Sequence, residues 1–249
     1  MAAAGQPKLI VEADAEALAR AAAERVMARI AANPDRIAIC LTGGSSPKKL
    51  YQLLGSEAWR GRIPWQRVHW FIGDERFVPA SDPLNNMAVA RATFLDRNAA
   101  SSHIHPIQTA TETPEQSAAA YARELQAFYG SDRLDPSRPL FDLVLMGAGP
   151  DGHTASLFPG FPEIEENERW VVGVPKANVA PFVPRVSLTL PALASCREML
   201  FQIAGHDKQP ILTRLLNGET LPALRARSAG ETVWLVDRAA LPEGIRGPR

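Results

Sequence analysis

Cysteine is scarce in this sequence, and a long apolar run and an excess of either charge are missing. Its 249 residues include two cysteines, Cys40 and Cys196, without a Cys-x-x-Cys pair or a disulfide framework, as in proteins of a reducing compartment. No apolar run approaches the roughly 20 residues that span a bilayer, and the short Ala-rich start lacks the pattern of a signal peptide. We therefore expect a cytoplasmic protein without a membrane partner, and Cys40 in its core.

The charges balance, since Lys and Arg together number 27 and so do Asp and Glu. Nucleic-acid binders usually carry a basic excess, so we expect no nucleic-acid partner, while a local basic pocket for a small anion stays open. Hydrophobic residues make up 46% of the chain, close to the globular average. The length allows one sizeable α/β domain or two small ones. We expect a single α/β domain over residues 1–249, with no obligate protein partner.

Apolar periodicity predicts strands that alternate with helices. Strands are predicted at 37–41, 68–72, 141–146, 170–174, 186–190, 199–204 and 232–236, and helices at 14–32, 48–54, 85–95, 114–128 and 207–216. This order favours a mostly parallel sheet with helices on both faces. Ligands bind such sheets outside the carboxyl ends of the strands. Three glycine-containing loops follow predicted strands, so we expect them to meet at that edge.

The first of these loops, residues 42–47, is a candidate phosphate site. Glycines allow a sharp turn that exposes backbone N–H groups, and a helix start favours negative charge. Ser46 is predicted as the N-cap and Pro47 as the first helical residue. An ordinary strand-to-helix turn explains the loop equally well, and the Walker A spacing is missing. The candidate ligands are Thr42, Gly43, Gly44, Ser45 and Ser46.

The second loop places Asp74, Glu75 and Arg76 just past the strand predicted at 68–72. The Arg76 guanidinium could fork onto a phosphate or a carboxylate. A solvated surface ion pair is the alternative, which these few residues alone favour.

The third loop, residues 147–156, contains G-x-G-x-x-G after a strand but does not predict a dinucleotide site. Pro150 interrupts it, and the proline- and glycine-rich residues 158–162 stop any helix. What remains is His153 beside Asp151. Histidine is the residue type suited to proton transfer near neutrality, and Asp151 could orient its ring, although the spacing leaves their contact open.

The other histidines are weaker candidates for a functional site. His69 lies within a predicted strand and is expected to pack there. His103 and His105 form an H-x-H pair without a third ligand nearby, so we expect surface residues and no metal site.

Two further cations are candidates for the site. Asp207 is predicted to cap a helix, which places Lys208 in the first turn, where a cation is disfavoured by a few tenths to about 1 kcal/mol. A bound anion would offset that cost, although Lys208 could also bend into solvent. Arg185 stands at the start of the strand predicted at 186–190.

Together these segments resemble the 6-phosphogluconolactonase family. The matching stretches are LTGGSSPKKLYQLL (41–54), WFIGDERFVP (70–79), LVLMGAGPDGHTASLFPG (143–160), RVSLTLPAL (185–193) and GHDKQPIL (205–212). The resemblance implies a Rossmann-like sheet of the glucosamine-6-phosphate deaminase and ribose-5-phosphate isomerase type. It also implies hydrolysis of 6-phospho-D-glucono-1,5-lactone in the oxidative pentose phosphate pathway, without cofactor or metal. One departure is Asn85-Asn86, where the family often has Ser-Asn.

By matching position, His153 would be the catalytic histidine of this family, and Arg76 and Lys208 its cationic substrate contacts. His153 is then expected to act as general base, with Asp151 and Arg76 as catalytic partners. The expected substrate contacts are the loop at 42–46, Asp74, Arg185 and Lys208. Ser156 is an alternative nucleophile, but it lacks the G-x-S-x-G elbow.

Two rival functions are weaker. A deaminase of this superfamily would carry Phe-Asn-Glu-Pro after its Asp-Gly-His segment, and here residues 155–159 read ASLFP, without that carboxylate. A non-catalytic sugar-phosphate sensor would need a DNA-binding module, and the sequence has no basic helix pair.

Overall fold

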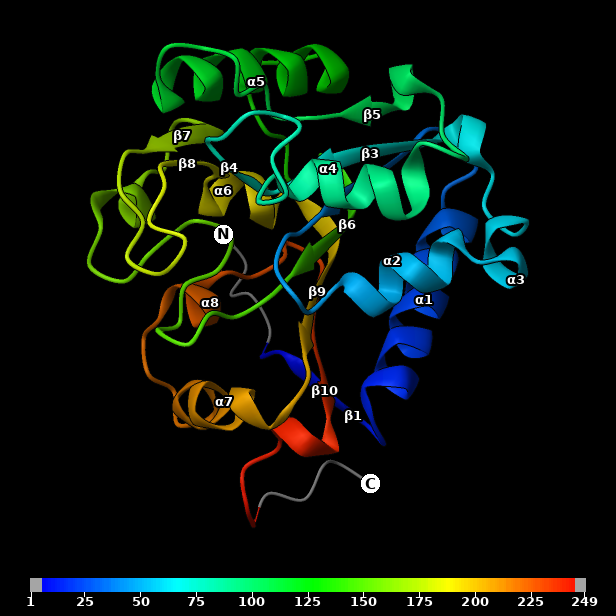
Figure 1. Cartoon of the computed structure of the whole chain (residues 1–249), viewed down its shortest axis with the longest axis vertical. Coiled ribbons are helices and arrows are strands. Elements are labelled where there is room, and N and C mark those ends of the chain that lie inside the picture. The colour runs from blue at the N-terminus through cyan, green and yellow to red at the C-terminus, as the bar shows by residue number, and fades with distance from the viewer. Residues whose placement is uncertain (1–5, 245–249) are drawn as a thin grey trace.

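The structure is a computed structural model that describes residues 6–244. A parallel sheet of seven strands forms its centre (Figure 1). Its spatial order is β1 (Lys8–Glu12), β10 (Glu231–Asp237), β9 (Cys196–Ile203), β6 (Phe141–Met146), β2 (Ile37–Leu41), β3 (Val68–Ile72) and β5 (Ile104–His105). Every residue of β2 and β6 is buried, as expected for parallel strands covered on both faces. The predicted sheet type is confirmed.

Helices cover both faces of this sheet. Figure 1 shows α1 and α2 on one side and α7 and α8 on the other. The α-helices are α1 (Ala15–Ala32), α2 (Lys48–Gly55), α3 (Glu57–Arg60), α4 (Asn86–Ala90), α5 (Pro114–Tyr129), α6 (Leu190–Ala194), α7 (Gln209–Leu216) and α8 (Pro222–Arg225). A π-helical turn, Arg91–Leu95, continues α4, and short 3-10 turns lie at Trp65–Arg67, Ser101–His103, Pro162–Glu165, His206–Lys208 and Arg238–Ala240.

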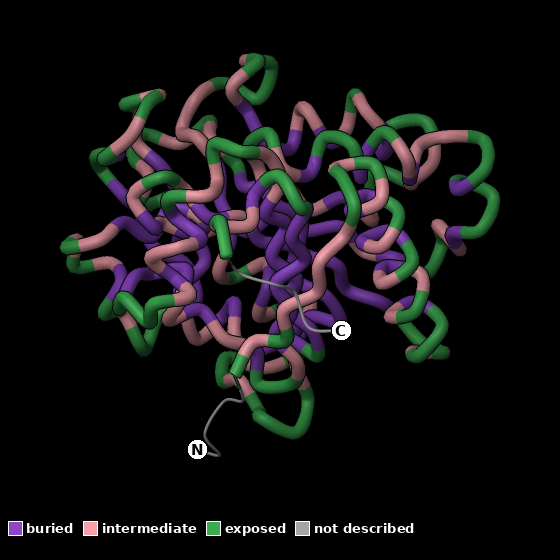
Figure 2. Tube along the Cα trace, turned by 90° about the horizontal axis from the view of Figure 1, so that it is seen from below, coloured by how far each residue is buried: buried purple, intermediate pink, exposed green. Residues whose placement is uncertain are grey.

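The longest helices begin where local chemistry predicts. The Asp14 side chain accepts a hydrogen bond of 2.8 Å from Ala17 N and caps α1. Thr113 caps α5 in the same way, and Gly130, with a φ of +78°, ends that helix. Figure 2 shows the buried segments in the middle of the molecule, surrounded by exposed loops. Both cysteines are buried, which confirms Cys40 as a core residue. No helix among residues 6–244 is long and apolar enough to cross a membrane.

A second, antiparallel sheet of three strands adds a wall to the carboxyl edge of the first. It pairs β4 (Asp74–Arg76) with β8 (Arg185–Leu188) and β8 with β7 (Val171–Val174). The register sets Arg76 opposite Arg185. Residues 74–76 were expected in a loop, and pairing with a strand more than a hundred residues away makes them a strand instead. The strand predicted at 186–190 ends at Leu188, because α6 begins at Leu190.

Two predicted helix caps are wrong. Ser46 does not cap α2, because a turn closed by Lys48 N and Ser45 O places Pro47 at the cap, without a side-chain bond. Asp207 does not cap α7 either. A 3-10 turn occupies residues 206–208, and α7 starts at Gln209, with a proline in its first turn, so that Lys208 stands at the cap position.

Candidate active site

One cavity of about 460 Å³ collects the predicted residues at the carboxyl edge of the sheet. The loops after β2 and β6 line it together with β4, which follows β3, and the expected convergence of three strand ends is confirmed. The predicted residues in its wall are Thr42, Gly43, Gly44, Ser45, Ser46, Asp74, Arg76, His153, Arg185 and Lys208. Asp151 is not in the wall, and it reaches the cavity through His153.

His153 and Asp151 form a hydrogen-bonded pair. Nδ1 of His153 lies 2.5 Å from Oδ1 of Asp151, which also accepts from the His153 backbone N at 3.1 Å. Burial raises the pKa of Asp151, but the hydrogen bonds and charge of His153 outweigh it, so this pKa is lowered overall. Because an ionised carboxylate only accepts, the proton of the imidazole belongs on Nδ1. Nε2 then keeps the lone pair that a general base needs.

The glycines of this loop serve the imidazole ring and a tight turn. A Cβ at Gly149 would lie 2.0 Å from Cε1 of His153, so the ring can occupy its place only over a glycine. Gly152 has a φ of +91°, in the left-handed region that glycine favours. The Phe158 ring packs against His153, with centroids 4.9 Å apart. In the described chain no α-helix follows Gly152 before α6. The G-x-G-x-x-G pattern therefore has a local explanation.

The loop at 42–47 presents unused backbone donors. Thr42 is fixed by the Tyr51 hydroxyl, which accepts from Thr42 N at 3.1 Å and donates to Thr42 O at 2.7 Å. The N–H groups of residues 43–46 donate to no other group within residues 6–244, and α2 begins at Lys48, after Pro47 at its cap. Free N–H groups before a helix attract anions.

Three cations lie in the cavity wall and contact carbonyl groups. Nη1 of Arg76 donates to Leu84 O at 2.8 Å, Arg185 donates to Pro181 O at 2.7 Å, and Nζ of Lys208 donates to Ala148 O at 3.0 Å. None of them forms an ion pair with a carboxylate among the described residues. Burial lowers the pKa of Arg185, with nearby Asp74 opposing and Arg76 reinforcing that change. A bound anion would compensate this excess of positive charge.

Asp74 is the carboxylate of the cavity wall. Its Oδ2 accepts a hydrogen bond of 2.6 Å from the Ser156 hydroxyl, and both residues are buried. Ser156 thus gives its proton to a carboxylate and has no hydrogen bond to His153, which argues against Ser156 as the nucleophile.

Asn86 is a wall residue that the sequence analysis missed. Its Nδ2 donates to Asp74 O at 3.0 Å, and a Cβ at Gly43 would lie 2.1 Å from its Oδ1. The departure noted at Asn85 is a helix cap, because the Asn85 side chain accepts from Ala88 N at 2.8 Å. The Asn-Asn pair was therefore the available signal, and its second member faces the cavity.

A model of the glucosamine-6-phosphate isomerases/6-phosphogluconolactonase family matches residues 13–234. The chain belongs to this family. It is 37% identical to a 6-phosphogluconolactonase of Streptomyces coelicolor over 97% of both chains, and 37% identical to one of Synechocystis over 81% of this chain and 82% of that protein. The resemblance stated from the sequence is confirmed.

Solved structures of this family share the fold. The 6-phosphogluconolactonase of Thermotoga maritima superposes with a TM-score of 0.80 at 29% identity, covering 94% of this chain and 100% of that one. That of Trypanosoma cruzi gives 0.82 at 28% identity, covering 96% and 97%. A monomeric glucosamine-6-phosphate deaminase shares the fold at 19% identity, with a TM-score of 0.78. The predicted fold class is confirmed.

His69, His103 and His105 form a separate cluster. His69 lies in β3, and all three side chains are half-buried, so His103 and His105 are less exposed than predicted. Nε2 of His105 lies 2.9 Å from Nδ1 of His69, and Nδ1 of His105 lies 2.7 Å from Oε1 of Glu124. The two histidines are close because β5 pairs directly with β3. In the part of the chain that the structure describes, no three His, Cys, Asp or Glu side chains are arranged to hold a metal ion.

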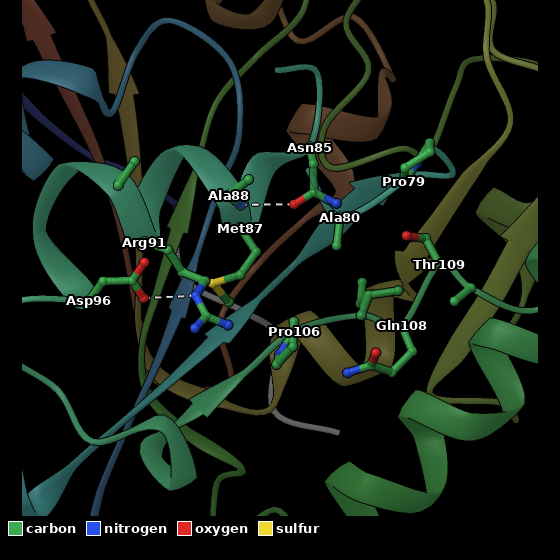
Figure 3. A pocket seen from close by; sticks show the side chains of 13 residues that line it. Pro79, Ala80, Asn85, Met87, Ala88, Arg91, Asp96, Pro106, Gln108 and Thr109 are labelled. Carbon is green, nitrogen blue, oxygen red and sulfur yellow. Dashed lines mark hydrogen bonds and ion pairs between the residues drawn. The ribbon is translucent and has the colours of Figure 1, made fainter. Parts of the chain in front are cut away.

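A second cavity, of about 590 Å³, lies beside the start of α4 (Figure 3). Its wall is mostly small or apolar and includes Met87, Ala88 and Ile107. The charged groups in this wall are Arg91 and Asp96, and they bond to each other at 2.8 Å. This larger cavity offers neither a histidine nor an uncompensated charge.

Proposed function

We propose that this protein hydrolyses 6-phospho-D-glucono-1,5-lactone to 6-phospho-D-gluconate, a step of the oxidative pentose phosphate pathway. The observation that carries the proposal is the oriented His153–Asp151 pair in the same cavity as free N–H donors and uncompensated cations. The names of the related proteins support the same reaction. We further propose that the chain acts as a single domain in the cytoplasm, in keeping with its scarce cysteine.

The substrate would bind by its phosphate. The N–H groups of residues 43–46 would donate to the phosphate oxygens, with charge from Arg76 and Lys208 and further hydroxyl donors in the loop. Arg185 would add a second guanidinium. The carboxylate of Asp74 would accept from hydroxyl groups of the sugar, because it is the acidic group in this wall.

The lactone would then open by general-base catalysis. As a water oxygen attacks the carbonyl carbon, Nε2 of His153 takes its proton, and Asp151 stabilises the imidazolium through Nδ1–H. Loop N–H groups or Arg76 would hold the oxyanion. The bond to the ring oxygen then breaks, and His153 returns the proton to that oxygen. General-base catalysis of this kind typically accelerates a reaction by about 10²–10⁴-fold. A lactone is an activated ester, so no covalent intermediate is needed.

A sugar-phosphate deaminase or isomerase is the alternative, since the family includes both activities. Residues 155–159 lack the carboxylate that a deaminase would carry after Asp-Gly-His, which favours the lactonase.

The deciding experiment compares purified protein on 6-phosphogluconolactone and on glucosamine-6-phosphate. We expect lactone opening well above the spontaneous rate and no release of ammonia. Ammonia release without accelerated lactone opening would assign the protein to the deaminases.

A further inference from the structure

Glu75 is a buried carboxylate that the reaction described above does not use. It lies between Asp74 and Arg76 in β4, and alternation along a strand turns its side chain away from the cavity that those neighbours line. It is 0% exposed. No Lys, Arg or His pairs with it in the described chain. A buried carboxylate without a cation is costly unless hydrogen bonds compensate it.

Three backbone N–H groups supply that compensation. Oε1 of Glu75 accepts from Asn86 N at 2.6 Å and from Arg76 N at 2.8 Å, and Oε2 accepts from Met87 N at 2.9 Å. Burial still raises the pKa of Glu75 to about 7, against the lowering effect of these bonds. One carboxylate therefore joins β4 to the first residues of α4.

Two cavity-lining groups depend on this junction. The Asn86 side chain reaches Asp74 O and fills the space above Gly43. Nη1 of Arg76 reaches Leu84 O, just before α4. If the start of α4 moved relative to β4, both the Asn86 amide and the Arg76 guanidinium would leave their places in the wall.

We propose that Glu75 is a positioning residue for substrate binding, whose buried carboxylate holds Arg76 and Asn86 in the geometry that receives the phosphorylated substrate. This role rests on the proposed function of the cavity. Glu75 touches no reacting atom, and it acts through the two groups that it anchors. His153 and Asp151 stand on the separate loop after β6, so Glu75 has no direct connection to the proton transfer.

The test is the nearly isosteric variant Glu75→Gln. Its amide NH₂ cannot accept, so at least one of the three N–H bonds is lost. We expect KM for the lactone, and the Kd for inorganic phosphate measured by calorimetry, to rise about tenfold. The fall in kcat is expected to be smaller, because His153 and Asp151 keep their places and Arg76 is only one of the candidate oxyanion donors. A structural role alone would lower stability without this split between KM and kcat.

Glu198→Gln is the matched control. Glu198 is also a buried strand carboxylate, but it pairs with Arg25 and Arg29 of α1 and does not line the cavity. This variant should lose stability and keep wild-type KM and Kd. Equal losses of affinity in both variants would overturn the proposal, as would unchanged KM and Kd in folded Glu75→Gln.

Glu75→Asp extends the test if the glutamine variant does not fold. It keeps the charge but is too short to reach all three N–H groups, so the same rise in KM and Kd is expected. If neither variant folds, Glu75 is a structural residue and the proposal fails. The phosphate measurement also separates the two hypotheses. If phosphate affinity falls in Glu75→Gln but the wild-type protein leaves the lactone intact, the lactonase reaction is contradicted and the positioning role is not.

Discussion

The cavity beside α4 is larger than the candidate active site, but its wall offers fewer groups for binding or catalysis. The larger, of about 590 Å³, is walled by small and apolar side chains, and its Arg91 and Asp96 neutralise each other. The smaller, of about 460 Å³, holds a histidine oriented by a carboxylate and three cations without an ion-pair partner among residues 6–244. Convergent, unsatisfied polar groups therefore mark a site better than volume does.

The difference has a topological cause. The smaller cavity lies where β2, β3 and β6 end, so that loops from distant parts of the sequence meet there. The larger cavity lies between the start of α4 and residues 106–110, which follow β5 at the edge of the sheet. The two share a wall, because Asn86 faces the smaller cavity and its neighbours Asn85 and Met87 line the larger.

The largest expected effect is that of His153→Ala. Removal of the base should lower kcat by about 10²–10⁴-fold and leave the affinity for 6-phosphogluconate close to wild type, because the anion contacts remain. Steady-state kinetics and calorimetry check both parts. His103→Ala, outside both cavities, should keep wild-type kcat. Unchanged turnover in His153→Ala would show that His153 is not the general base.

Gly149→Ala should come next, with about a 10²-fold loss of kcat. The new Cβ would lie 2.0 Å from the present place of Cε1 of His153 and must displace the ring, and a misplacement near 1 Å can cost about this much. Gly61→Ala is the control, because a Cβ there meets no atom within 4 Å. Equal kinetics for the two alanine variants would mean that the ring position is unimportant.

Lys208→Ala should raise KM by about 10–100-fold, the usual worth of a hydrogen bond to a charged group, with little change in kcat. Phosphate binding is nearly the same in ground and transition states, so it appears in KM. Lys49→Ala removes a lysine that pairs with Glu16 on the surface, and it should leave the kinetics unchanged. An effect of Lys208→Ala on kcat alone would contradict its assigned role.

Glu75, which lies behind the shared wall, should make the stability of the protein depend on pH. The pKa of Glu75 is raised by burial from 4.5 to about 7, so the folded state holds this proton more tightly than the unfolded state. The resulting stabilisation is complete below pH 4.5 and is lost as the pH rises through about 7. Relative to Glu75→Gln, wild-type protein should lose about 3 kcal/mol of unfolding free energy between about pH 4.5 and 8. Urea unfolding of both proteins measures this, and parallel pH curves would refute it.

The smallest effect is expected in the larger cavity. Gln108 is exposed in its wall (Figure 3), and Gln108→Ala should leave kcat and KM within about twofold. A rise in KM comparable to that of Lys208→Ala would show that the larger cavity takes part in substrate binding.

Sequence alone predicted the features that depend on local pattern or on general rules of topology. Apolar runs predicted seven of the strands but missed β1, β4 and β5. The rule that ligands bind at the carboxyl ends of parallel strands joined the loop at 42–47 to His153. The strand pairing of Arg76 with Arg185 was not predictable, because three polar residues carry no strand signal and the partner is distant. Asn86 escaped notice because its place depends on packing against Gly43, which only the folded chain defines.

The most direct measurement is the structure of this protein with bound 6-phosphogluconate. We expect the phosphate to lie against the N–H groups of residues 43–46, within reach of Arg76 and Lys208, and the C1 carboxylate to lie beside Nε2 of His153. A ligand seated in the cavity next to α4, or one whose C1 lies far from the imidazole, would contradict it.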